Sequence, residues 1–238
     1  YIMVVQCIIQ GQKSDAKVRQ EIEHQVEVDA DGNVIDTVVI RRTHAGTAGE
    51  QFYGAPNISY VRAYVPMGSA LIEAGGFTYP PEDAFRVPEP WYTEDPHIAL
   101  FEHERQVHVE SGTRITEEFG KTVFGNWVVT NPEEVSEVYF SYRLPFRVSV
   151  EQRIASNTKK WHSILFSDEA KITSRYTLVT QKQSGVDSVL RSRIIYPSGW
   201  TPVWVSNDEM DMAANGAVYE TELNRDRVIG ILLEQTQE

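Results

Sequence analysis

The residues best suited to chemistry gather between positions 97 and 110, where histidines alternate with carboxylates. The group consists of His97, Glu102, His103, Glu104, His108 and Glu110. On a β-strand, the period of two residues places Glu102, Glu104, His108 and Glu110 on one face and His103 on the other. Zinc binds imidazole and carboxylate groups, so His103, His108, Glu104 and Glu110 are candidate metal ligands. Because no spacing of the His-X-X-X-His type accompanies them, we favour a solvated polar strand face and predict no metal and no cofactor.

The same carboxylates, from Glu102 to Glu110, could belong to an enzyme that acts on envelope polysaccharide. Glycoside hydrolysis needs two acidic groups about 5 to 9.5 Å apart in a cleft, and an acidic chain offers many such pairs by composition alone. The sequence has no Gly-X-Ser-X-Gly, Gly-X-Gly-X-X-Gly or Walker pattern. Cys7 lies in an apolar run, where we expect a packed side chain rather than a reactive one. We therefore assign no catalytic residue and predict a protein that is not an enzyme.

Four aromatic residues are the stronger indication of function. Trp91 and Tyr92 lie in a proline-rich segment, and Trp200 and Trp204 bracket a short segment near a turn. Exposed aromatic rings bind sugar rings or partner proteins by stacking and apolar contact. The alternative, which we favour, is that these rings cap a hydrophobic core or hold a loop against it. Trp91, Tyr92, Trp200 and Trp204 are the candidate ligand-binding residues.

The overall charge excludes one class of partner. The 238 residues carry 22 basic and 34 acidic side chains, a formal net charge of -12, and the closest basic groupings are pairs such as Arg41-Arg42 and Lys159-Lys160. A chain of this charge repels polyanions, so we expect no nucleic acid partner. A single cysteine excludes an internal disulfide framework.

The targeting features of the chain are few. No apolar run approaches the ~20 residues that span a bilayer, and no signal peptide is recognisable. The chain begins Tyr1-Ile2-Met3, and we interpret it as a piece of a longer protein.

Alternating apolar and polar residues predict an all-β fold. Residues 120–145 are expected to form a hairpin that turns at Asn131-Pro132-Glu133-Glu134, with Val138, Phe140 and Tyr142 buried on one face. A second hairpin is expected from 21 to 41, with its turn at 29–33. Residues 77–97 contain five prolines, which exclude a central strand there and predict a long surface excursion of the kind that often carries function.

These elements suggest two consecutive antiparallel β-sandwich domains of the immunoglobulin-like type. The predicted divisions are an N-terminal tail or edge strand over 1–20, a sandwich over 21–145 that contains the proline-rich insertion 77–97, and a smaller sandwich over 146–238. A length of 238 residues accommodates two domains of about 100 residues each.

Several phrases of the chain resemble one known family. They are the segment 14–27, the phrase Tyr-Val-Arg-Ala-Tyr-Val-Pro-Met-Gly-Ser at 60–69, Gly-Lys-Thr-Val-Phe-Gly at 120–125, Tyr-Arg-Leu-Pro at 142–145 and the segment 176–185 with Gln-Lys-Gln at 181–183. Together they resemble the C-terminal part of the bacterial domain-of-unknown-function family numbered 4012. The resemblance implies a membrane-anchored surface protein, with this piece outside the cell and its anchor elsewhere. It implies no activity and no catalytic residues.

From the sequence we expect a non-catalytic extracellular module of a larger bacterial envelope protein, which acts as a structural element or as an interaction surface. The partners would be other envelope proteins or polysaccharide. The alternatives are a carbohydrate-binding module and an enzyme that processes envelope polysaccharide.

Overall fold

The computed structural model describes residues 1–238 except 11–12, 94, 149, 154–170 and 237–238. Within these residues nearly all regular structure is β-strand, which confirms the predicted all-β class. The exceptions are the short helices η1 (Ser14–Lys17), η2 (Glu82–Ala84) and α1 (Ile98–Phe101). None of the helices in the described residues has the length and apolar character that crossing a membrane requires.

The strands form two sheets. Within the described residues, sheet A has nine strands in the order β13 (Trp200–Val205), β16 (Arg227–Gln235), β11 (Lys171–Gln181), β1 (Ile2–Ile8), β4 (Asn57–Pro66), β8 (Lys121–Thr130), β7 (Arg114–Glu118) and β6 (His103–Val107), with β10 (Val150–Arg153) also paired to β11. Sheet B has seven, in the order β14 (Met210–Ala213), β15 (Gly216–Glu222), β12 (Ser188–Ile195), β2 (Val18–Val28), β3 (Asn33–His44), β9 (Val135–Arg147) and β5 (Ala70–Gly75).

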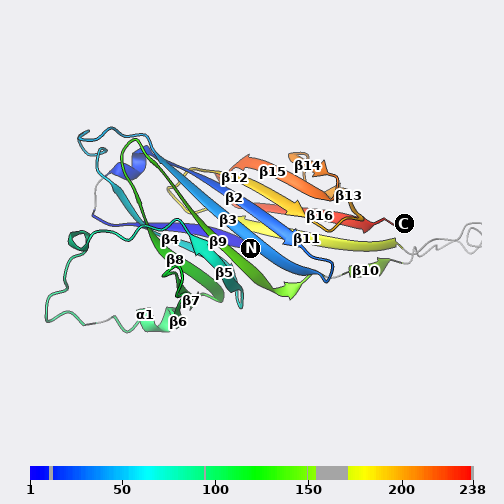
Figure 1. The fold of residues 1–238 in the computed structure, drawn as a ribbon, viewed down its shortest axis with the longest axis horizontal. Helices are drawn as coiled ribbons and strands as arrows, with labels where there is room; N and C mark the ends of the chain where they lie inside the picture. The colour runs from blue at the N-terminus through cyan, green and yellow to red at the C-terminus, as the bar shows by residue number, and fades with distance from the viewer. Residues whose placement is uncertain (11–12, 94, 149, 154–170, 237–238) are drawn as a thin grey trace, which may run out of the picture.

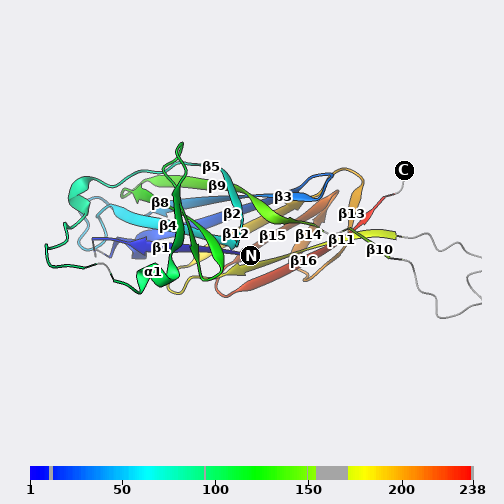
Figure 2. The ribbon, with the colours of Figure 1, turned by 90° about the horizontal axis from the view of Figure 1, so that it is seen from below.

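The two sheets pack face to face in an elongated sandwich (Figures 1 and 2). Alternate residues of each strand point inward, as the pleat requires, so that β2 and β3 bury every second side chain. The inward side chains of both sheets form one continuous hydrophobic core. Its fully buried members include Val26, Val38, Ile40, Val61, Phe124, Phe140, Leu178 and Leu190.

The hairpin predicted between residues 21 and 41 is confirmed. β2 and β3 pair antiparallel from Val18 with His44 to Val28 with Val34. The Asp29 carboxylate closes the turn by accepting hydrogen bonds from the backbone N–H groups of Asp31 and Asn33, at 2.9 and 2.8 Å. The turn is therefore specified locally, by an aspartate that bonds the backbone two and four residues ahead.

The hairpin predicted over 120–145 is wrong, although its turn is correct. β8 pairs with β4 and β7 in sheet A, whereas β9 pairs with β3 and β5 in sheet B. The chain therefore crosses between the sheets after Thr130, and the arms meet through side chains: the Phe124 and Phe140 rings lie 6.1 Å apart across the core. Val138, Phe140 and Tyr142 are buried as predicted.

Two similar four-strand units lie side by side in the sandwich. In the first unit, β1 and β4 are antiparallel in sheet A, and β2 and β3 are antiparallel in sheet B. In the second unit, β11 with β16 and β12 with β15 repeat this arrangement. The units are joined by two parallel pairings, β1 with β11 and β2 with β12. We call these two pairings the seam.

The seam bears on the predicted domain organisation. Strands from both sides of the predicted boundary are hydrogen bonded within the same sheets, and Pro145 lies inside β9 rather than in a linker. Two consecutive immunoglobulin-like domains are therefore not confirmed, and the fold is a sandwich of two mixed sheets. Within 77–97, apart from residue 94, no strand forms, as the prolines predict.

The described part of residues 1–20 forms neither a tail nor an edge strand. β1 pairs with β4 over six residues on one side and with β11 at Ile2 and Met3 on the other. Beyond that short pairing, the Gln183 side chain takes the place of a neighbouring strand: its Oε1 accepts from the Gln6 N–H at 2.8 Å and its Nε2 donates to the Gln6 carbonyl at 3.0 Å. The edge prediction failed because the partners of β1 lie far along the chain.

A buried arginine ties the first unit together. Arg42, on β3, is 0% exposed and donates from Nη2 to Gln6 Oε1 at 2.9 Å and to Asn57 Oδ1 at 2.8 Å. Asp15 is its nearest carboxylate, at 3.5 Å. Burial lowers the Arg42 pKa to about 10, and the Asp15 charge opposes this shift only in part.

The continuous sheets predict a single cooperative unfolding transition. In hydrogen exchange measured by mass spectrometry across a denaturant series, peptides from β2 and β3 should lose protection at the same denaturant concentration as peptides from β12 and β15. Coincident loss is expected because neither unit can separate without breaking the seam. Two well-separated midpoints would instead establish two independent domains.

Candidate binding surface

The segment from Phe77 to Phe119, which we call the excursion, is fixed to the sandwich at its start. The Phe77 ring packs at 5.3 Å on Phe140 in the core, and the Thr78 N–H donates to the Trp127 carbonyl at 3.1 Å. Further along, Phe85 meets the Trp127 ring at 5.3 Å. Trp127 itself contacts Tyr60 at 4.9 Å on the outer face of sheet A. These rings hold the proline-rich part of the excursion to a rigid strand.

Beyond Phe85, the excursion exposes its largest aromatic side chains. Trp91 is 73% exposed and Tyr92 is 67% exposed. Their ring centroids lie 6.3 Å apart at an interplanar angle of 82°. A turn in which the Tyr92 N–H donates to the Glu89 carbonyl at 2.9 Å fixes their backbone. We call residues 87–93 together with Asp95 the tip. Contrary to our preference in the sequence analysis, Trp91 and Tyr92 cap no core.

Apolar exposure continues along the rest of the excursion. The Phe101 and Phe119 rings stack on each other at 5.3 Å, and both remain exposed. The α1, β6 and β7 segment that carries them lies beside β8 along one long side of the molecule (Figure 1). Other exposed apolar side chains of the excursion are Tyr79, Val87, Ile98, Leu100, Val107 and Val109. Exposed apolar residues concentrated in one segment are typical of interaction surfaces.

The other two predicted aromatic residues lie elsewhere. β13, which carries Trp200 and Trp204, lies near the end of the long axis opposite to the excursion tip in both views (Figures 1 and 2). Trp200 packs on Tyr196 with ring centroids 5.8 Å apart, whereas Trp204 is exposed. The four candidate residues therefore form two separate groups and not one site.

The histidine and carboxylate cluster does not form a strand face. β6 ends at Val107, so His108 and Glu110 lie in the turn that follows it. There His108 Nε2 pairs with Glu110 Oε2 at 3.2 Å, and His108 Nδ1 lies 2.9 Å from Ser111 Oγ. The side chains of His103 and Glu104 lie outside those that the structure describes. Among the described side chains, no three His, Cys, Asp or Glu groups are arranged to hold a metal ion.

A cleft on the outer face of sheet A is a feature that the sequence analysis missed. It encloses about 280 Å³ and is lined by residues that include Cys7, Tyr60, Arg62, Arg114 and Glu118. Cys7 is exposed rather than packed, with Sγ 3.7 Å from an Arg62 nitrogen. The sequence pattern that could have predicted this cleft is the alternate spacing of Tyr60, Arg62 and Tyr64. It places all three on the face opposite the buried Val61 and Ala63.

Glu118 is the hub of this cleft. Its carboxylate is 5% exposed and accepts hydrogen bonds from Arg62 at 3.1 Å, from the Tyr64 hydroxyl at 2.8 Å and from the Thr116 hydroxyl at 2.8 Å. Burial and the bond to this carboxylate raise the Tyr64 pKa. Arg62 and Tyr64 lie on β4 and Glu118 lies on β7, so the network links these two strands of sheet A across the intervening β8.

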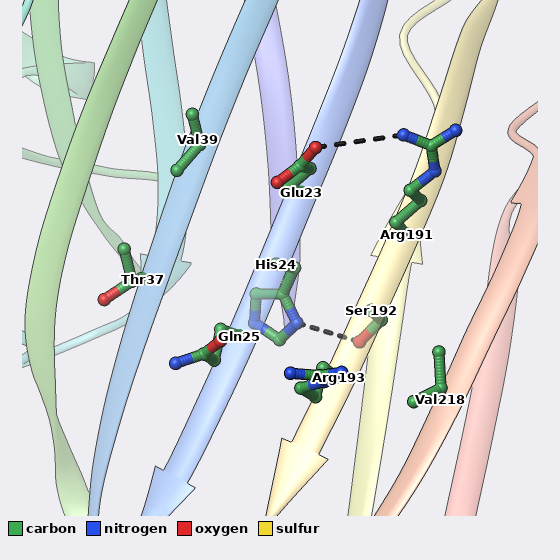
Figure 3. Close-up of a pocket in the computed structure, with 9 residues that line it drawn as sticks. All are labelled: Glu23, His24, Gln25, Thr37, Val39, Arg191, Ser192, Arg193 and Val218. Atoms are coloured by element: carbon green, nitrogen blue, oxygen red, sulfur yellow. Dashed lines mark hydrogen bonds and ion pairs between the residues drawn. The ribbon is translucent and has the colours of Figure 1, made fainter.

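Sheet B has a shallow depression of about 360 Å³ over the seam (Figure 3). On its outer side, Arg191 on β12 pairs with Glu21 and Glu23 on β2, both at 3.9 Å, and with Glu220 on β15 at 3.1 Å. These ion pairs are exposed, and each contributes little to stability alone. They link three neighbouring strands across the seam.

Two residues that line this depression, Ser192 and His24, make with Asp36 a chain of contacts that resembles a hydrolase triad. His24 Nδ1 lies 3.0 Å from Ser192 Oγ, and His24 Nε2 lies 3.4 Å from Asp36 Oδ2. The ring order is the reverse of the serine protease arrangement, in which Nε2 faces the serine. Ser192 and His24 are each 1% exposed, so no substrate reaches the hydroxyl. The contacts instead satisfy polar groups inside the core and connect β2 with β12.

Replacement of the hub carboxylate should destabilise the fold. Glu118→Ala leaves Arg62 and Tyr64 without their acceptor, and we expect the free energy of unfolding to fall by about 3 kcal/mol. Glu117→Ala, at the adjacent residue on the opposite face of β7, is the matched control and should cost under about 0.5 kcal/mol. Urea denaturation followed by circular dichroism measures both. Equal losses in the two variants would contradict the role given to Glu118.

The buried tyrosines predict a loss of stability at alkaline pH. Burial, followed by the nearby Asp36 charge, raises the pKa of Tyr142 and Tyr176, and burial raises the pKa of Tyr196 to about 12. Above pH ~10, tyrosines of the unfolded chain lose protons that the folded chain keeps, so stability falls by about 1.4 kcal/mol per pH unit for each such tyrosine. The lowered pKa of Arg42 has the opposite effect, because the folded chain loses that proton before the unfolded chain does. This is one group against several tyrosines.

The experiment is urea denaturation between pH 9 and pH 12, in which the free energy of unfolding should decline from about pH 10. Tyr196→Phe should make the decline shallower, because one proton fewer is linked to unfolding. An unchanged slope in that variant would show that the Tyr196 hydroxyl does not contribute.

Comparisons with known proteins do not identify a family. No family model matches the chain, and no curated protein matches it. Among solved structures, an M1 zinc metallopeptidase from Deinococcus radiodurans has a TM-score of 0.33 and 7% sequence identity, covering 92% of this chain and 42% of that chain. A mutant of that enzyme, alone or bound to a Tyr-Ser-Ala substrate, gives a TM-score of 0.34, with 95% and 43% covered. The chain thus spans less than half of these chains, and likenesses at this level carry no argument about its activity.

Proposed function

We propose that the chain is a non-catalytic interaction module of a larger envelope protein and that the excursion is its binding surface. The observation that carries this proposal is the exposure of Trp91 and Tyr92 in a loop whose start is anchored to sheet A. An aromatic side chain on a fixed loop has little conformational entropy left to lose, so its burial by a partner contributes strongly to affinity.

The extracellular location and the membrane anchor of the parent protein belong to the same proposal. Their support is the resemblance of the strand and turn phrases at 60–69, 120–125 and 142–145 to a family of bacterial surface proteins. The seam and the continuous core are consistent with a rigid structural element that displays a surface at one end. Other envelope proteins are the partners that we propose.

A carbohydrate-binding module is the second candidate. The ring arrangement favours it, because Trp91 and Tyr92 are exposed next to each other at 82°. A pyranose ring could stack on the Trp91 face while the Tyr92 hydroxyl donates to a sugar oxygen. A polysaccharide-processing enzyme has no comparable support, because His108 and Glu110 pair with each other in an exposed turn.

Removal of both rings at the tip tests the proposed surface. The Trp91→Ala/Tyr92→Ala variant should lose at least about tenfold in affinity for envelope components, since truncation of a central aromatic residue costs more than about 1.4 kcal/mol. The measurement is binding of the labelled chain to purified envelope polysaccharide and, separately, to purified envelope proteins. The two probes distinguish the two candidate functions.

Trp204→Ala is the matched control, because Trp204 is an exposed tryptophan at the other end of the molecule. Its binding should equal that of the parent chain, and the melting temperatures of both variants should stay close to the parent value. If the double variant binds as the parent does, or if Trp204→Ala loses as much, the excursion tip is not the binding surface.

A further inference from the structure

We infer that the excursion tip accepts a protein segment that is both cationic and apolar. This inference rests on the proposed function and specifies the partner of the same surface. It follows from the charges that surround the exposed rings.

The excursion holds most of the excess negative charge of the chain. Residues 77–119 contain ten acidic and three basic side chains, a formal charge of -7 within a total of -12. The excursion is less than a fifth of the sequence. The negative charge is therefore concentrated in the excursion, whereas acidic and basic side chains are more nearly balanced in the rest of the chain.

The two described carboxylates of the tip have no cationic partner within the described residues. Glu89 and Asp95 flank the two rings in sequence and are exposed. Within the described part of the chain neither forms an ion pair, although the Asp95 carboxylate accepts a hydrogen bond from the His97 N–H at 2.9 Å. At the base of the excursion, by contrast, Glu102 pairs with Arg114 at 3.8 Å. On sheet B, Arg41 similarly pairs with Glu137 at 3.2 Å.

Unpaired carboxylates that flank exposed aromatic rings in the sequence match one type of partner best. An arginine or lysine can stack over the Trp91 or Tyr92 face as a cation–π contact while its charge pairs with Glu89 or Asp95. Apolar side chains of the same segment would cover Val87 and the remaining ring surface, both of which are exposed. Nucleic acid and anionic lipid are repelled by this charge, and a neutral glycan gains nothing from it.

The experiment uses three synthetic peptides of equal length as probes: a leucine–arginine repeat, a leucine–glutamate repeat and a serine–arginine repeat. Binding of each labelled peptide to the whole chain is followed by fluorescence anisotropy at low and high salt. We expect the leucine–arginine peptide to bind most tightly, with affinity that falls as salt screens the charges. The serine–arginine peptide should bind at least about tenfold more weakly, because it provides no apolar contact.

Two charge variants locate the site. Glu89→Gln/Asp95→Asn removes two charges at the tip, and the asparagine keeps an oxygen for the turn bond to His97. Asp208→Asn/Asp211→Asn removes two exposed charges near and on β14, which lies toward the end of the molecule opposite to the tip (Figure 1). We expect the first pair to weaken leucine–arginine binding by about fivefold or more, and the second pair to leave it nearly unchanged.

Equal effects of the two charge variants would overturn the inference, because they would indicate nonspecific attraction to an acidic chain. Preference for the leucine–glutamate peptide would overturn it as well. If Trp91→Ala/Tyr92→Ala abolishes binding to polysaccharide but no cationic peptide binds, the proposed surface stands and the cationic partner falls. If Trp91→Ala/Tyr92→Ala changes the binding of neither polysaccharide, envelope proteins nor peptides, the proposed surface and the cationic partner are both refuted.

Discussion

The parallel pairing of β2 with β12 is the contact on which the rest of the molecule depends. It runs over eight residues, from Gln20 with Ser188 to Glu27 with Ile195. Side chains reinforce it from both faces, since Gln20 donates to Ser188 at 2.9 Å inside and Arg191 pairs with Glu21 and Glu23 outside. Without this pairing each four-strand unit would present an open sheet edge, which natural proteins avoid because such edges pair with other chains.

The seam also explains why the excursion can carry exposed rings. Loops that bind are positioned by a rigid scaffold, and here the scaffold reaches from the seam through β3 and β9 to the Phe77 contact on Phe140. On the opposite sheet, Trp127 holds Phe85 against β8. The chain that leads to the tip is therefore anchored in the core by Phe77 and on the outer face of sheet A by Phe85. Within the described residues, the backbone of the tip makes few hydrogen bonds beyond the turn at Glu89.

The features that the sequence could predict are those specified by neighbouring residues. The β2–β3 hairpin was predictable because Asp29 closes its own turn, and the absence of strands in the described part of 77–97 because its prolines exclude them. The placement of β8 and β9 in different sheets was not predictable, because alternation shows only that one face is buried and is the same for strands that meet edge to edge or across a core. Glu118 was missed because its partner Arg62 lies 56 residues earlier, a distance over which no local pattern reports contact.

Exposed aromatic rings usually carry the risk of self-association, and the charge distribution of this chain opposes that risk. Two copies that approached through their tips would bring together two excursions of formal charge -7, and like charges within a Debye length repel. The same charge attracts a cationic partner from a distance before the rings make contact. Negative charge and apolar exposure in one segment are therefore compatible, because the charge repels acidic surfaces and favours the burial of Trp91 and Tyr92 by a cationic one.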